Sequence, residues 1–158
     1  MMTSTAFAKI NAKSWSKNCV TGADKKESCS IAIIHEVEDK NKKKSTLATA
    51  FVVKTQATSK DKKDTKTPVT ALVINLPLNV DLTVKPQVQI DGKKLLDLSF
   101  TNCNQNDGCK TLSLISDANI EQIKKSKTLS VITRASGSAS NIKIDFPLKD
   151  FGKEFKNL

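Results

Sequence analysis

The sequence predicts an all-β protein in which two antiparallel sheets pack face to face as a β-sandwich. Apolar and polar residues alternate with a period of two over most of the chain, as they do in strands that bury one face. No regular alternation of strands with helices is present, which argues against a parallel sheet. Hydrophobic residues make up 38% of the chain but aromatic residues only 4%, so an aliphatic core is expected, and β-branched residues favour strands.

The length of 158 residues fits one domain. We expect residues 15–158 to form a single β-sandwich domain and residues 1–14 to be a disordered N-terminus or a signal-peptide remnant. Residues 3–8 end in the small-x-small pattern of a signal-peptidase site, although the charged and apolar regions that should precede such a site are absent. The alternative is an arbitrary boundary of the sequence.

Three strands are predicted in the first half of the chain. Residues 29–37 form one of them, with Ile31, Ile33, His35 and Val37 on one face and Ala32 and Ile34 on the other. Residues 47–54 and 69–76 are apolar on both faces, which is typical of central strands in a sandwich. The polar, lysine-rich residues 38–45 and 55–67 between these strands are predicted to be loops.

The middle of the chain predicts a hairpin and one further strand. Residues 82–90 alternate most cleanly, and Pro86 within them indicates an edge strand or a bulge. Asp91-Gly92 is a strong signal for a two-residue type I′ turn, because glycine accepts the positive φ that this turn needs. Residues 95–100 then form the return strand, and residues 110–115 form another short strand.

The last third predicts a short helix and a second hairpin. Residues 117–125 form the helix, with Asp117 capping its start and lysines at its end. Residues 128–134 and 142–146 alternate as the two strands of a hairpin, and the tail 147–158 can turn helically. The complete prediction has about eight strands and one short helix.

The charge of the chain is compatible with an anionic partner or with a lysine-rich surface that is simply solvated. There are 26 basic and 16 acidic residues, a net charge of +10. Nucleic acid is disfavoured as that partner, because Arg134 is the only arginine and no aromatic residue lies within the basic runs. The chain therefore offers a single guanidinium for bidentate contacts, and it lacks a platform on which bases could stack.

Two lysine-rich segments remain as candidates for contact with lipopolysaccharide, an anionic glycan or an acidic lipid. The predicted strand between them has about nine residues and spans about 30 Å, so they form one patch only if the loops bend toward each other. The alternative is two solvated loop tips. The candidate residues are Lys40, Lys42, Lys43, Lys44, Lys60, Lys62, Lys63 and Lys66.

The four cysteines favour two local disulfides, Cys19 with Cys29 and Cys103 with Cys109. Structural zinc sites prefer cysteine pairs two to four residues apart, which this chain lacks, so a zinc site and reduced thiols are the weaker alternatives. Disulfides imply an oxidising compartment, the periplasm or the outside of the cell.

The sequence has little that suggests catalysis. His35 is the only histidine, and it lies at strand spacing from apolar residues, which is typical of a partly buried structural histidine near Glu36 or Glu38. No nucleophile elbow, phosphate-binding loop or dinucleotide fingerprint occurs. We therefore expect no enzyme activity, no metal and no cofactor. No apolar run is long enough to span a membrane.

Several short motifs occur in a specific order along the chain. They are Trp15, Cys19, Cys29, Leu76-Pro77-Leu78, Gln89-Ile90-Asp91-Gly92, Phe100, Cys103, Cys109, Phe146-Pro147-Leu148 and Phe151. Their order and spacing resemble the invasion-associated locus B family over about residues 15–155. The chain has Asn79 and Asp150 at two positions where members of that family usually have glycine. Asn and Asp tolerate positive φ better than most residues, so we expect both turns to be kept.

This resemblance implies both a fold and a function. Members of the family are small secreted bacterial proteins with an immunoglobulin-like β-sandwich, and some are linked to invasion of host cells or erythrocytes. We therefore expect an exported, non-enzymatic protein of the periplasm or cell surface. Its partner would be a host-cell protein, an envelope protein or an anionic glycan. The alternative is a periplasmic module that binds an anionic envelope component through its lysine loops, and salt-sensitive binding would favour it. An unrecognised hydrolase is the third and weakest hypothesis.

Overall fold

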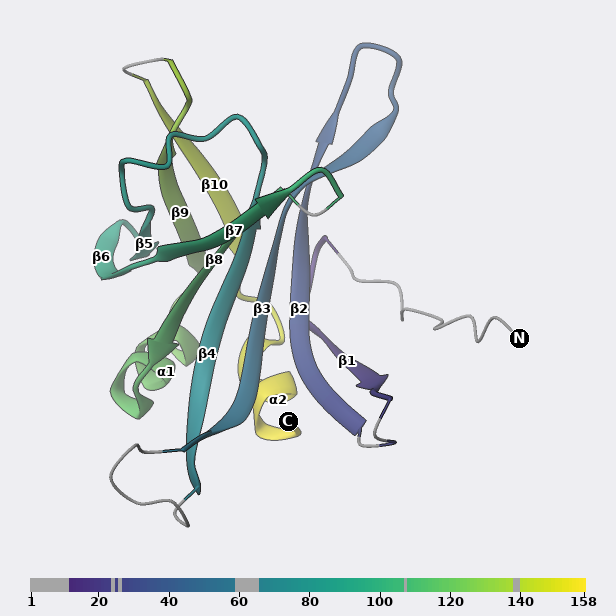
Figure 1. Cartoon of the computed structure of the whole chain (residues 1–158), viewed down its shortest axis with the longest axis vertical. Coiled ribbons are helices and arrows are strands. Elements are labelled where there is room, and N and C mark those ends of the chain that lie inside the picture. The colour runs from purple at the N-terminus through teal and green to yellow at the C-terminus, as the bar shows by residue number, and fades with distance from the viewer. Residues whose placement is uncertain (1–11, 24, 26, 59–65, 107, 138–139) are drawn as a thin grey trace.

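The computed structural model describes residues 12–23, 25, 27–58, 66–106, 108–137 and 140–158. Within these residues it has ten strands and two short helices (Figure 1). The strands are β1 (Ser16–Thr21), β2 (Glu27–Glu38), β3 (Lys44–Thr58), β4 (Lys66–Leu76), β5 (Gln87–Ile90), β6 (Lys93–Asp97), β7 (Ser99–Asn104), β8 (Gly108–Ile115), β9 (Thr128–Arg134) and β10 (Asn141–Pro147). The helices are α1 (Asp117–Lys124) and α2 (Phe151–Lys156). Neither described helix is long and apolar enough to cross a membrane.

The strands form two antiparallel sheets, in the orders β1-β2-β3-β4-β8-β7 and β10-β9-β5-β6. Aliphatic side chains from both sheets meet between them, as expected for a two-layer sandwich. The all-β architecture with two packed antiparallel sheets is therefore confirmed. The immunoglobulin-like arrangement stays a prediction, and the described strands and helices are more numerous than the expected eight and one. Core residues with 0% exposure include Ile31, Val52, Leu72 and Ile74 from the larger sheet and Val88, Val131 and Ile144 from the smaller one.

The sequence pattern does not predict β1. Among its six residues only Asn18 is buried, so the strand has no apolar alternation. It pairs with β2 through regular antiparallel register, and Trp15 just before it is 1% exposed. Tertiary pairing, rather than side-chain pattern, therefore creates this strand.

The strand predicted for residues 82–90 is wrong over its first half, because β5 begins only at Gln87. The Asp81 carboxylate accepts hydrogen bonds from the Thr83 hydroxyl (2.6 Å) and the Thr83 backbone N–H (2.9 Å). These bonds lower the pKa of Asp81, and the Arg134 guanidinium adds to the effect. A side-chain turn of this kind competes with strand pairing, and Leu82 is left 56% exposed.

The return strand predicted for residues 95–100 is two strands in different sheets. β6 ends at Asp97 and pairs with β5, whereas β7 begins at Ser99 and pairs with β8. Leu98 between them is fully buried, and its backbone N–H donates a hydrogen bond to the Pro86 carbonyl (2.8 Å). The chain crosses from one layer to the other at this residue.

Two turns depend on positive φ. Asp91 and Gly92 have φ values of 48° and 86°, which confirms the predicted turn between β5 and β6. Asp150 precedes α2 with φ of 64°, so aspartate adopts the left-handed conformation there without glycine. Asn79, the other such position, is not among the residues with positive φ in the described part of the chain.

The helix predicted for residues 117–125 is present as α1, but its N-cap differs from the expected one. The Ser116 hydroxyl accepts a hydrogen bond from the Asn119 backbone N–H (3.2 Å), and Asp117 is the first helical residue. Asp117 still stabilises the helix, because a carboxylate in the first turn interacts favourably with the helix dipole. The predicted helical turn in the tail is α2.

An aromatic cluster joins the start of the sandwich to its end. The Trp15 indole N–H donates a hydrogen bond to the Pro147 carbonyl (2.8 Å), and its ring meets Phe151 edge-on with centroids 5.0 Å apart. Phe151 in turn stacks on Phe155. Residues far apart in sequence therefore close one corner of the core, which gives Trp15, Pro147 and Phe151 a shared structural role.

Candidate binding surfaces

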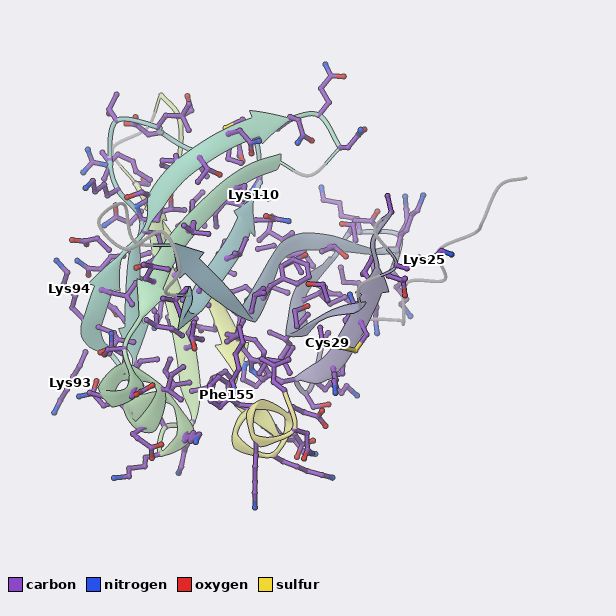
Figure 2. All side chains as sticks on the ribbon, turned by 60° about the horizontal axis from the view of Figure 1, so that its bottom comes forward. Lys25, Cys29, Lys93, Lys94, Lys110 and Phe155 are labelled. Atoms are coloured by element: carbon purple, nitrogen blue, oxygen red, sulfur yellow. A yellow bond between two sulfur atoms is a disulfide. The ribbon has the colours of Figure 1, made fainter. Side chains whose placement is uncertain are left out.

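Each of the two disulfides crosslinks the paired strands of one hairpin in the six-stranded sheet. Cys19 is bonded to Cys29 between β1 and β2, and Cys103 to Cys109 between β7 and β8. In each pair the two cysteines stand directly opposite each other in the antiparallel register. Figure 2 labels Cys29 at the first of these bonds. Because these are local crosslinks within hairpins, they hold strand pairs together and supply no free thiol for metal binding or nucleophilic chemistry.

The described lysines of the two lysine-rich segments lie at opposite ends of β3. One segment is the turn between β2 and β3, which projects from the body of the molecule (Figure 1) and ends at the pair Glu38 and Lys44. Lys66 begins β4 at the far end, opposite Thr58. β3 has 15 residues, or about 45 Å of extended chain. Three of the predicted residues, Lys60, Lys62 and Lys63, lie outside the described residues.

The turn between β2 and β3 presents four exposed lysines, Lys40, Lys42, Lys43 and Lys44. The Asp39 carboxylate organises this turn by accepting hydrogen bonds from the backbone N–H groups of Asn41 (2.8 Å) and Lys43 (2.9 Å). The lysine side chains remain directed to solvent on a short, well-organised turn, which suits a weak contact with an anionic surface.

His35 lies in a hollow of about 400 Å³ where β2 passes β10. Its Nδ1 is 2.8 Å from the Asp145 carbonyl oxygen, and its ring is edge-on to Phe146. The hollow also contains Glu36 and Glu38, as the sequence suggests. The Ser130 hydroxyl donates to the Asp145 carboxylate instead of to the imidazole. His35 therefore bridges the two sheets through a main-chain contact, and no described nucleophile is paired with it.

The outer surface of the six-stranded sheet carries an apolar patch, which we call the outer face and define by Phe51, Val53, Val73, Leu112 and Leu114. The register places Phe51, Val73 and Leu112 in one row across β3, β4 and β8. Val53 and Leu114 stand in the neighbouring row, on either side of Ala71. Most residues that alternate with them on the same strands are buried, namely Ala50, Val52, Leu72, Ile74, Thr111 and Ile115. These strands lie side by side in Figure 1.

The outer face is accessible. Leu114 is 60% exposed and Leu112 is 37% exposed, and the other three side chains are partly exposed. A shallow hollow of about 320 Å³ is lined by Phe51, Val53 and Val73 together with Asn75 and Lys110, and Figure 2 labels Lys110 on β8. Neighbouring exposed apolar side chains of this kind make the outer face a candidate for contact with a partner.

A more polar hollow of about 390 Å³ continues from the outer face toward the end of β4. Asn75 lines both hollows, and its side-chain oxygen is buried without a hydrogen-bond partner among the described residues. Gln105, Asn106 and the 52% exposed Leu78 lie around the second hollow. An apolar patch with amide groups at its margin has the composition of a protein contact surface.

The sequence pattern of β3 and β4 indicates an apolar outer face as well as an apolar core face. Residues 47–54 and 69–76 are apolar on both faces. In a two-layer sandwich each sheet covers only one face of its neighbour, so the second apolar face of such strands must meet solvent or a partner.

The β7–β8 turn depends on Gly108, which packs against the end of β4. Gly108 has φ of +79°, and a Cβ added there would lie 2.1 Å from the Leu76 carbonyl oxygen. The Leu76-Pro77-Leu78 motif and the Cys103–Cys109 hairpin therefore touch each other, which explains why these two landmarks occur together.

Comparisons with known proteins agree with this arrangement. The family model described as "Invasion associated locus B (IalB) protein" matches residues 15–158. The crystal structure of invasion associated protein B from Bartonella henselae superposes with a TM-score of 0.69 at 13% sequence identity, covering 97% of this chain and 94% of that one. At that identity the likeness concerns the fold. No curated protein sequence matches this chain. Because the family model spans the whole sandwich from Trp15 to the last residue, the chain belongs to the invasion associated locus B family.

Proposed function

We propose that this protein is exported and acts without catalysis at the cell envelope or cell surface, by docking its outer face onto another protein during interaction with a host cell. The exposed apolar patch centred on Leu112 and Leu114 carries this proposal. The family name supports the host context, and the two disulfides support an oxidising compartment.

The physical argument rests on what exposed apolar area does in water. Removing such area from water releases about 25 cal/mol per Å², so a patch of partly exposed Phe, Val and Leu side chains favours association. Lys110 and Asn75 at its margin supply the polar contacts that orient a partner. Since the driving force is apolar burial, association through this face should tolerate physiological salt.

The test uses a pull-down from envelope and host-cell extracts with three forms of the protein. The L112S/L114S double variant removes the most exposed apolar groups of the outer face. The L82S variant is the matched control, since Leu82 is 56% exposed but lies on a different part of the surface. We expect one salt-resistant partner to be captured by the wild type and by L82S but lost from the double variant. Equal capture by all three forms would refute docking through the outer face.

A second candidate function rests on the four exposed lysines of the β2–β3 turn. In it the protein is a periplasmic module that binds lipopolysaccharide, an anionic glycan or an acidic lipid. The wild type should then be retained on immobilised heparin or lipopolysaccharide at low salt and lose that retention at physiological salt. Changing Lys42, Lys43 and Lys44 to Ser should abolish the retention at low salt. Unchanged retention would identify the turn as a solvated loop tip.

A further inference from the structure

A third hollow lies between the β5–β6 hairpin and the end of α1, remote in the fold from the β2–β3 turn. Its volume is about 420 Å³, within the range of small-ligand sites. Ile90 and Leu95 form an apolar floor. Three lysines line it: Lys93 and Lys94 open β6, and Lys125 caps the C-terminus of α1. Figure 2 shows Lys93 and Lys94 on the hairpin beside this helix.

The charges in this hollow are only partly balanced. Lys94 is paired with Asp97 at 3.2 Å. Asp91, the acidic residue of the lining, directs its carboxylate to the backbone N–H groups of Lys127 and Thr128. Within the described part of the chain, Lys93 and Lys125 have no ion pair. Two lysines without a carboxylate partner in the described residues therefore line one concave surface, which raises the local positive potential.

The neutral groups of the hollow are suited to hydroxyl groups. The Ser126 hydroxyl donates a hydrogen bond to the Gln122 carbonyl (2.7 Å), which orients its oxygen while leaving lone pairs to accept another bond. The Gln122 side-chain amide is exposed and can both donate and accept. A small inorganic anion would use only the lysines of this hollow. The apolar residues, the hydroxyl and the amide suit a larger ligand, a sugar ring that carries the anionic group.

The helix itself does not attract an anion here. The hollow meets the C-terminal end of α1, where the helix dipole places partial negative charge. The attraction must therefore come from the lysine side chains. Binding in this hollow should depend strongly on Lys93 and Lys125.

From these groups we infer that the hollow binds a sulfated or phosphorylated sugar unit of an anionic glycan. Lys93 and Lys125 contact the anionic group, Gln122 and Ser126 contact ring hydroxyls, and Ile90 and Leu95 contact the apolar face of the ring. This site is separate from the outer face and from the lysines of the β2–β3 turn, so it stands independently of the proposed function.

The test measures binding of two probes to the full chain at 150 mM salt, a heparin tetrasaccharide and glucosamine 6-phosphate, by isothermal titration calorimetry. The variant K93Q/K125Q removes the unpaired ammonium groups. The control K85Q/K143Q removes two exposed lysines, one before β5 and one on β10, and has the same net charge. We expect affinity to fall about tenfold or more for the first variant and to change less than about twofold for the control. The preferred probe distinguishes a sulfated glycan from a phosphorylated one.

Chemical-shift mapping on the wild type provides a second measurement that does not depend on the variants folding. The inference predicts that either probe shifts the backbone amide signals of Gln122, Lys125 and Ser126 first. It is overturned if neither probe binds, if both lysine variants lose affinity equally, or if the shifts fall on the β2–β3 turn.

Discussion

Removing the disulfides should destabilise the protein by an amount that follows from the length of the loops they close. The Cys19–Cys29 bond has a sequence separation of 10 and the Cys103–Cys109 bond a separation of 6. The chain-entropy relation then assigns about 2.7 kcal/mol to the first bond and about 2.2 kcal/mol to the second. The two together are a large share of a typical stability of about 5–15 kcal/mol.

The native fold should survive the loss of either bond. β1 keeps its pairing with β2, and β7 keeps its pairing with β8, because both ladders extend on either side of the cysteines. Trp15 additionally anchors the start of β1 through its hydrogen bonds to Pro147 and Lys149. The effect therefore lies mainly in the unfolded state, which gains conformational freedom when a crosslink is removed.

The assay is urea unfolding of the double variants C19A/C29A and C103A/C109A, followed by fluorescence of the single tryptophan. We expect losses of about 2.7 and 2.2 kcal/mol and, for C19A/C29A, a melting temperature lower by about 5–10 °C. The slope of free energy against urea should stay the same or rise, since the unfolded chain expands. Wild-type protein in excess reductant is the control that retains the buried Cys109 sulfur, and it should lose about 5 kcal/mol.

Two results would refute this reasoning. A loss below about 0.5 kcal/mol for both variants would show that the crosslinks do not restrict the unfolded chain. A marked decrease in the urea slope would show that the strand pairs separate in the native state, so that the ladders alone do not hold them.

Three further predictions follow from individual residues. G108A should lower the free energy of unfolding in urea by more than about 1 kcal/mol. G137A is the control and should lower it less, because Gly137 has φ of +72° but open space around it. Equal losses would contradict the role of the close contact at Gly108. W15A should cost about 3–5 kcal/mol, since the ring is 1% exposed, and a loss below about 1 kcal/mol measured by circular dichroism would contradict a role in the core. The hydrogen bonds from Thr83 lower the pKa of Asp81, so the stabilising effect of its carboxylate is present above the ordinary pKa of 3.8 and is lost as the pH falls through the lowered pKa. In an NMR titration T83V should raise the pKa of Asp81. An unchanged titration midpoint would contradict Thr83 as the cause.

Local patterns were sufficient to predict most of the individual elements. Apolar residues at strand spacing predict β2, β9 and β10, and short runs that are apolar on both faces predict β3 and β4. The Asp91-Gly92 turn and α1 follow from backbone preferences of a few adjacent residues. These features are determined by interactions between residues close in sequence, and so they can be inferred without the fold.

Other elements depend on contacts that sequence patterns do not contain. β1 exists because β2 and the Trp15 cluster hold it in place, and the chain changes layer at Leu98 because that side chain reaches the core. The candidate sites depend on such contacts too. Residues from three strands meet on the outer face, and Lys93 and Lys125 line the same hollow only because the β5–β6 hairpin lies beside α1.

The sequence alone therefore determined the strand-rich architecture, the local cysteine pairing and the family resemblance, each of which depends on spacing along the chain. Tertiary structure alone decided which apolar faces are covered and which lysines share a concave surface. The physical reason is that burial and electrostatic potential are set by distances between residues far apart in sequence, and those distances exist only after the two sheets pack.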